Sequence, residues 1–451
     1  MIQTMDKESV KATEPHLQKF QRFEQQSQQP PWVFPLRKAG IARFAERGFP
    51  TLKDEDWRFT NVAPIAKLPF KPVFPPLRAT LAADQISQFT FGRIPAFRLV
   101  FVNGLYAPEL SSVPAQAGEV TIKSLAAALA SDSAFLEKTL ARQGADARDP
   151  FMALNTAFFQ DGAFVHVPAG KVFETPIHLL FVSTTQEAGT TIHPRNLIVA
   201  EKGSQATVIE SYVAAGDAAY FTNGITELVV EDGAVVEHCK FQDESPSAFH
   251  VVGVQARLGR RANLVSHSIA IGARLSRTSI HTTLAGEGVE CVLNGLYLTH
   301  GEQLADHHMV VEHAQPYCNS HEYYNGILDG RSKGVFHGRI LVRPQAQKTD
   351  AKQTNKNLLL SEEATVDTKP QLEIYADDVK CTHGATVGQL NDESIFYLRA
   401  RGIGVDTARR MLIHAFAGEI IERIRCRPVR EELDRLVWGR LEANPHVGEK
   451  R

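Results

Sequence analysis

Glu201-Lys-Gly-Ser204 and Glu231-Asp-Gly-Ala234 are two tight-turn sequences, and a short run of β-forming residues follows each of them. The turn recurs as Leu258-Gly-Arg-Arg261 and Ala285-Gly-Glu-Gly288, which places Gly203, Gly233, Gly259 and Gly286 at intervals of 30, 26 and 27 residues. A repeat of this length is typical of a solenoid coil that carries two or three short strands. The repeat therefore predicts a mainly β protein built as a parallel β-helix.

The repeat lies in a strand-rich body that we place at residues 163–390. Runs rich in Val, Ile, Leu and Thr alternate there with Gly, Asp, Asn and Ser. Residues 1–96 read as an irregular, partly helical N-terminal region, and residues 97–162 as a mixed α/β segment leading into the body. A β-sandwich with a helical tail shares this spacing of short strands and is the alternative architecture.

The end of the chain, residues 391–451, has a helical pattern. Asp392 and Asp406 are expected to cap the first two helices, and Arg430–Leu441 predicts a third. Because the end of a solenoid exposes unpaired strand edges, we expect a cap or a partner there.

The composition excludes several classes of partner. The 451 residues contain 49 Lys and Arg against 51 Asp and Glu, a net charge of −2, which predicts no nucleic-acid binding. No apolar run is long enough to cross a membrane, and the polar, Gln-rich start of the chain is unlike a signal peptide, so a cytoplasmic protein is expected. The sequence Gly330-Arg-Ser-Lys-Gly334 lacks the spacing of a phosphate-binding loop, so the chain is not expected to hydrolyse ATP.

Five cysteines are scattered along the chain without a Cys-x-x-Cys pair, which predicts neither a disulfide framework nor a self-contained cluster site. The densest group of histidines is His307, His308 and His313. Adjacent residues of a strand point to opposite faces, so His307 and His308 are not expected to share a metal ion.

The most informative stretch is Ala376–Gly388, which contains Cys381-Thr-His383. Two residues apart, Cys381 and His383 lie on one face of an extended strand and can face a common iron. Two ligands are too few for a closed site, so further ligands would come from a second chain. The neighbouring Asp377 and Asp378 are expected to disfavour a thiolate, which makes His383 the readier ligand. A packed cysteine and a hydrogen-bonded histidine are the structural alternative.

The stretch from Lys369 to Gly388, followed by Ile395-Phe-Tyr-Leu-Arg-Ala-Arg-Gly402, resembles the C-terminal signature of the SufD branch of the SufB/SufD family of iron–sulfur cluster assembly proteins. Asp54-Glu-Asp-Trp-Arg-Phe-Thr60, Asn155–Gly162 and Asp350–Leu360 extend this resemblance over nearly the whole chain.

The resemblance implies a right-handed parallel β-helix between helical ends. It further implies a non-catalytic scaffold that pairs with its paralogue SufB and binds the ATPase SufC through the C-terminal helices. A nascent iron–sulfur cluster would form at the SufB boundary. There the histidine that the family contributes to the cluster corresponds to His383, and the resemblance implies a cluster contact by Cys381 more weakly. A flavin in the complex and a homodimer of the isolated chain are both compatible with the sequence.

Two other functions compete with the scaffold. A β-helical carbohydrate-active enzyme would need acidic and basic side chains converging in a lateral groove. A self-contained metal-binding protein would use His307, His308 and His313, and stoichiometric iron binding by the purified chain alone would support it; we expect no such binding.

Overall fold

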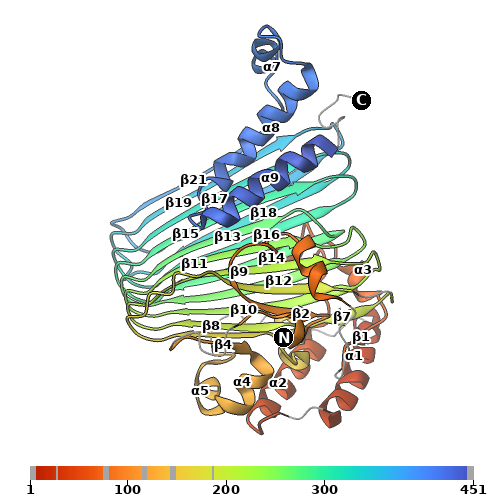
Figure 1. The fold of residues 1–451 in the computed structure, drawn as a ribbon. Coiled ribbons are helices and arrows are strands. Elements are labelled where there is room, and N and C mark those ends of the chain that lie inside the picture. The colour runs from red at the N-terminus through yellow and green to blue at the C-terminus, as the bar shows by residue number, and fades with distance from the viewer. Residues whose placement is uncertain are drawn as a thin grey trace.

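The computed structural model describes residues 7–26, 29–74, 81–113, 119–142, 149–184 and 187–443. It is mainly β, with two long sheets that face each other and helices at both ends of the stack (Figure 1). Sheet A consists of β1 (Lys71–Pro72), β4 (Thr121–Ser124), β5 (Ala163–Val167), β7 (Thr190–Ile192), β8 (Arg195–Ala200), β10 (Phe221–Val230), β12 (Phe249–Leu258), β14 (Leu275–Leu284), β16 (Leu304–His313), β18 (Lys333–Val342) and β20 (Thr365–Ile374). Sheet B consists of β2 (Phe97–Val102), β3 (Leu105–Tyr106), β6 (Ile177–Ser183), β9 (Gln205–Ala214), β11 (Val235–Asp243), β13 (Asn263–Ala270), β15 (Glu290–Thr299), β17 (Asn319–Leu328), β19 (Asp350–Leu359) and β21 (Lys380–Gly388).

From β8 on, the chain alternates between the two sheets, so each strand pairs with the strand two positions later in the sequence, in parallel register. The result is a parallel β-solenoid of about eight coils, as the turn repeat predicts. These parallel registers rule out the antiparallel sandwich that was the alternative. Apolar side chains from both sheets fill the interior, among them Val208, Val254, Leu293 and Phe336.

A column of residues in the left-handed conformation forms one corner of the solenoid. The backbone N–H of Gly203 donates to Asp232 O in the next coil, and that of Gly233 donates to Arg260 O. The column continues through Arg261 and Gly288. Glycine is favoured at such positions because it has no Cβ to clash at positive φ.

The predicted turn glycines Gly259 and Gly286 lie in the same corner but do not have positive φ. A Cβ on Gly286 would approach the backbone nitrogen of Arg260 to 2.1 Å, and one on Gly259 would lie 2.8 Å from the nitrogen of Asp232. These two glycines therefore allow successive coils to pass close to each other.

Helices cover the first end of the solenoid and one outer face. The α-helices are α1 (Lys7–Gln26), α2 (Val33–Arg47), α3 (Ala63–Ala66), α4 (Leu125–Ser131), α5 (Ser133–Thr139), α6 (Pro150–Phe158), α7 (Asp392–Arg399), α8 (Val405–Ile421) and α9 (Arg427–Ala443), and the short 3-10 helices are η1 (Glu55–Trp57), η2 (Ala83–Gln88) and η3 (Pro108–Leu110). α8 and α9 lie along the outer face of sheet B, while α7 projects beyond the last strands (Figure 1).

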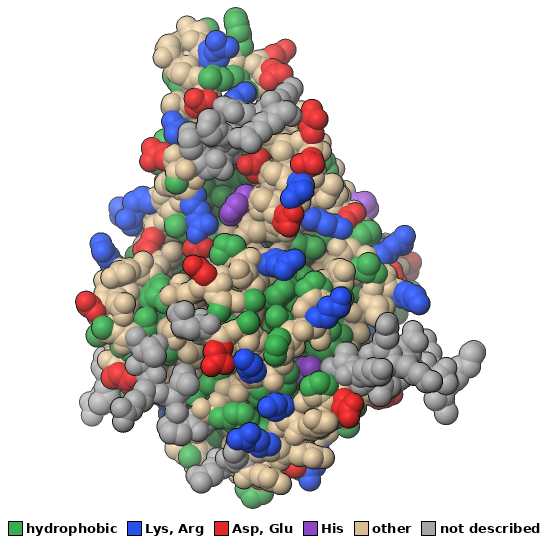
Figure 2. All heavy atoms as spheres, turned by 90° about the vertical axis from the view of Figure 1, so that its right-hand side faces the viewer, with side chains coloured by type: hydrophobic (Ala, Val, Ile, Leu, Met, Phe, Trp, Pro, Cys, Tyr) green, Lys and Arg blue, Asp and Glu red, His purple; other side chains and the backbone are tan. Residues whose placement is uncertain are grey.

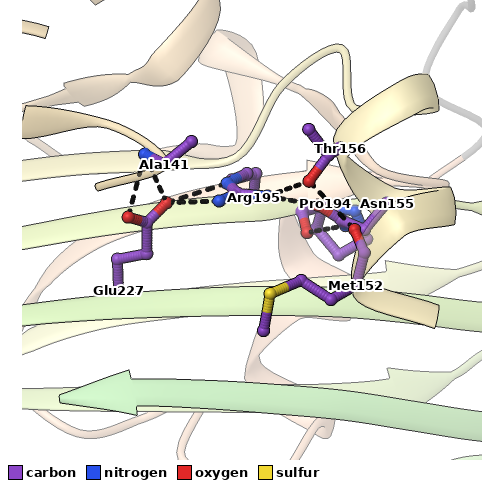
Figure 3. Close-up of polar contacts among 7 residues, drawn as sticks. All are labelled: Ala141, Met152, Asn155, Thr156, Pro194, Arg195 and Glu227. Carbon is purple, nitrogen blue, oxygen red and sulfur yellow. Dashed lines mark hydrogen bonds and ion pairs between the residues drawn. The ribbon is translucent and has the colours of Figure 1, made fainter. Parts of the chain in front are cut away.

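A buried polar network joins α6 to the first coils (Figure 3). The Arg195 guanidinium contacts Glu227 Oε1 at 2.6 Å and also donates to Asn155 Oδ1 and Thr156 Oγ1. The other side of the Glu227 carboxylate accepts the backbone N–H of Ala141. Because both charges are almost fully buried, each depends on the other and on these hydrogen bonds. This network gives the Asn155–Gly162 motif a structural role.

The C-terminal helix caps differ slightly from the prediction. Asn391, and not Asp392, is the N-cap of α7, where its side chain accepts the N–H of Ser394. α8 is capped by Gly404, and Asp406 lies in its first turn, where a negative charge favours the positive end of the helix dipole. The expected capping residue is thus one or two positions off in both helices.

Candidate functional site

The solenoid ends on β20 and β21. Among the residues that the structure describes, β20 pairs only with β18 and β21 only with β19. Cys381 is in register with Ala351, and His383 with Gln353, both of which are buried in the interior. Cys381 and His383 therefore share the inward face of β21, in line with their two-residue spacing. Since no further coil covers them, His383 is exposed and Cys381 is half-buried. Their side chains lie at the open end of the solenoid.

The surroundings of Cys381 disfavour its thiolate. The residue packs against a small buried cluster that includes Ala346 and Ala351. Burial, and next the negative charge of Asp350 in the preceding coil, raise the pKa of the Cys381 thiol above its ordinary value. We expected this repulsion from Asp377 and Asp378, but Asp378 forms an ion pair with Lys348 and the opposing charge is that of Asp350.

His383 is the outermost member of an inward-facing column that continues through Gln353 and Glu322 in the two coils beneath it. Gln353 Nε2 donates to Glu322 Oε2 at 2.7 Å. Burial raises the pKa of the Glu322 carboxyl to about 7. The column therefore leads from the exposed imidazole to a buried acid inside the solenoid.

Exposed apolar side chains surround this open end. Ile374 ends β20, Tyr375 follows it, Val387 lies on β21, and all three are exposed. On α7, which buries none of its residues, Phe396 is 71% and Tyr397 56% exposed. Large apolar residues this exposed, next to unpaired strand edges, are typical of a protein–protein contact surface.

The histidine trio of the metal-binding alternative is spread over separate places. His307 points inward and lies between the rings of Tyr297 and Tyr324. His308 points outward, as the alternation of strand residues predicts, and its Nε2 is 3.7 Å from Asp56 Oδ1. His313 is buried, and its Nε2 is 2.8 Å from Ser320 Oγ.

His308 has a different neighbour that the sequence analysis missed. His337 is its register partner on β18, and the two ring centroids are 4.3 Å apart. Burial lowers the pKa of both imidazoles, and Arg277 adds to this effect at His308. The signal was available in the sequence, because 29 residues, about one coil, separate the two histidines.

A shallow hollow at one corner is lined by acidic and basic residues, the feature that a carbohydrate-active enzyme would need. Two of its acids bind the backbone of neighbouring turns. Asp232 accepts the N–H of Arg260 at 2.7 Å, and Glu231 that of Lys202 at 3.2 Å. These carboxylates therefore stabilise the turns at this corner of the solenoid.

Acidic and basic side chains are interspersed on the face shown in Figure 2, without a broad area of either sign. None of the helices in the described part of the chain is both long and apolar enough to span a membrane.

Comparison with known proteins covers almost the whole chain. Residues 12–179 match the SufBD protein N-terminal region, and residues 181–416 match the SufBD core domain of the SUF system for FeS cluster assembly. An iron–sulfur cluster assembly SufBD family protein of Synechocystis is 34% identical over 383 residues, which cover 83% of this chain and 84% of that protein. The iron–sulfur cluster assembly protein SufD of Escherichia coli is 33% identical over 90% of this chain and 93% of its own length. The chain therefore belongs to the SufB/SufD family of iron–sulfur cluster assembly proteins.

Proposed function

We propose that this chain is a non-catalytic scaffold subunit of a cytoplasmic iron–sulfur cluster assembly complex. Its open end pairs with the paralogue SufB, and a nascent cluster forms at the boundary between the two subunits. The observation that carries the proposal is the placement of Cys381 and His383 on the exposed inward face of the last strand, in a chain of this family.

The geometry supports a shared site. A cluster needs several protein ligands, and β21 offers two at an edge whose backbone N–H and C=O groups can pair with another strand. The apolar residues Ile374, Tyr375 and Val387 would be buried by a partner at this end. A homodimer of the isolated chain would use the same surface.

His383 is the stronger ligand candidate. Its side chain is exposed, whereas the Cys381 thiol is half-buried and its pKa is raised, so less thiolate is present near neutral pH. Asp350 adds to this effect. Cluster contact by Cys381 would then depend on an added partner charge or a bound iron ion to release its proton.

The test compares three variants of β21. His383→Ala removes an imidazole from an exposed position, so the chain should fold and assemble while cluster-dependent enzyme activity falls at least tenfold. Cys381→Ser should have a milder effect. Thr382→Ala, on the opposite face of the same strand, is the matched control and should keep full activity.

The measurement is the activity of a cluster-dependent enzyme in cells that lack any other assembly system. The amount of assembled complex is quantified in parallel. Full activity of His383→Ala at normal complex levels would remove its role as a ligand and leave the residue with a structural role.

A further inference from the structure

The segment Asp54–Thr60 crosses the outer face of sheet A and is fixed there at several points. The guanidinium of Arg277 lies 3.8 Å from the ring centre of the buried Trp57. Thr60 Oγ1 donates to Asp306 Oδ2 at 2.5 Å, and Lys369 Nζ pairs with Glu55 at 2.7 Å. These contacts hold η1 above β16 and β18 and bring Asp56 next to His308 and His337.

The three side chains offer a compact set of ligand atoms. One donor atom from each of Asp56, His308 and His337 lies within 4.8 Å of the other two. In the residues that the structure describes, no other group of three His, Cys, Asp or Glu side chains is this compact. Cys381 and His383 are not members of it.

One nitrogen of each ring is available to bind an ion. His337 Nε2 lies 2.6 Å from Gln371 Oε1, an oxygen that can only accept, so Nε2 carries the proton and Nδ1 the lone pair. His308 Nδ1 is buried and has no hydrogen-bond partner. The His308 nitrogen that faces Asp56 is Nε2, which lies 3.7 Å from the carboxylate, beyond hydrogen-bond distance, so it can bind an ion while Nδ1 carries the proton.

The basic side chains around the site are each paired with a carboxylate. The neighbouring Arg277 pairs with Asp306, Arg339 with Glu373, and Lys369 with Glu55. Each of these pairs is close to neutral, and Asp56, 3.7 Å from His308, supplies the carboxylate that a bound cation would meet.

We propose that Asp56, His308 and His337 bind a divalent transition-metal ion of the Zn²⁺ or Fe²⁺ type. Two imidazoles and one carboxylate form a ligand set that these ions favour, and it leaves coordination positions open for water or a further ligand. Bonds of about 2.1 Å require ligand atoms no more than about 4.2 Å apart. Asp56, whose side chain is 54% exposed, can rotate inward to close this gap. The two histidines lie on sheet A and Asp56 lies in η1, whereas Cys381 and His383 lie on sheet B, so the two sites share no residue.

The test uses the full-length chain, stripped of metal with EDTA and desalted. Titration with Co²⁺, followed by its visible absorption, and with Zn²⁺, followed by calorimetry, should each show one saturable equivalent. Zn²⁺ should also raise the unfolding temperature, because it binds the folded chain. Asp56→Asn and His337→Asn should each weaken binding at least tenfold, with unchanged circular dichroism and unchanged metal-free unfolding temperature.

Two controls separate this site from other sites on the chain. The double variant Cys381→Ser/His383→Ala should retain the bound equivalent. His166→Asn, which removes a histidine 2.9 Å from a single carboxylate of Glu201, should retain it as well. Unchanged binding in Asp56→Asn and His337→Asn, no saturable equivalent, or binding lost only in the Cys381/His383 variant would each overturn the proposal.

Discussion

Glu322 shows how a residue of the solenoid interior can respond to pH. It lies two coils beneath His383, is fully buried, and accepts one hydrogen bond from Gln353. Burial raises the pKa of its carboxyl from the ordinary value of 4.5 to about 7. The folded state therefore holds this proton more tightly than the unfolded state does, and the stability of the fold decreases as the pH rises from about 4.5 to about 7.

Glu322→Gln should remove this pH dependence. The variant should be close to the wild type in stability at pH 4.5 and more stable at pH 8, by on the order of 2–3 kcal/mol, because a neutral amide pays no cost of burying a charge. Thermal unfolding at the two pH values measures the difference. Glu362→Gln, an exposed glutamate, is the control. An equal effect of Glu322→Gln at both pH values would show that Glu322 does not titrate in this range.

The C-terminal helices have two different kinds of environment. α8 and α9 bury Ile413, Ile420, Val429 and Leu433 against the outer face of sheet B, whereas α7 buries no residue. Removing residues 392–451 would therefore expose an apolar sheet face and destabilise the solenoid, in addition to removing any docking surface. α7 is the exposed helix of this region, and we propose that it is the one that contacts the ATPase.

We expect Phe396→Asp on α7 to reduce co-purification of the SufC ATPase at least tenfold, because it places a charge on a surface that a partner would bury. The unfolding temperature should not change, since Phe396 is 71% exposed. Leu52→Asp, an equally drastic change at an exposed position of the N-terminal region, should leave co-purification intact. Normal recovery of the ATPase with Phe396→Asp would place the contact elsewhere.

How far the sequence predicts an element depends on whether its cause is local. The turn repeat and the β-branched runs predict the solenoid, and the spacing of Cys381 and His383 predicts their shared face. The predicted N-caps of α7 and α8 differ from the observed ones. Asn391 and Asp392 are both able to cap, and Gly404 caps without a side chain. The proximity of Asp56 to His308 depends on an irregular segment about 250 residues earlier in the chain, which no local pattern encodes.

At the scale of the whole molecule, stability depends on keeping successive coils in register. Gly233 and Gly286 lie in the same corner for different reasons. Gly233 has positive φ with nothing within 4 Å of an added Cβ, whereas a Cβ on Gly286 would meet the backbone of the preceding coil. Gly233 is needed for the left-handed backbone conformation, and Gly286 is needed because two coils pass close to each other there.

This difference predicts unequal effects of the same substitution. Gly233→Ala should lower the free energy of unfolding by about 1 kcal/mol, the cost of the left-handed conformation. Gly286→Ala should lower it by more than about 3 kcal/mol or prevent folding, because the backbone of Arg260 cannot move away without breaking the stack. Urea unfolding of both variants measures this, and similar losses in the two would contradict the assignment.

The two ends of the solenoid differ in a way that limits how many molecules can join. At the first end, the outermost strands β3 and β4 run antiparallel to their neighbours, and helices pack nearby. The other end stops on β20 and β21 with parallel strands and free edges. A filament grows only if both ends of each unit accept a neighbour, so we expect a molecule with one helix-covered end and one open end to accept a single partner. When the open ends of two molecules pair, no free strand edge remains for a third molecule. The assembly then stops at two molecules and does not grow into a fibre.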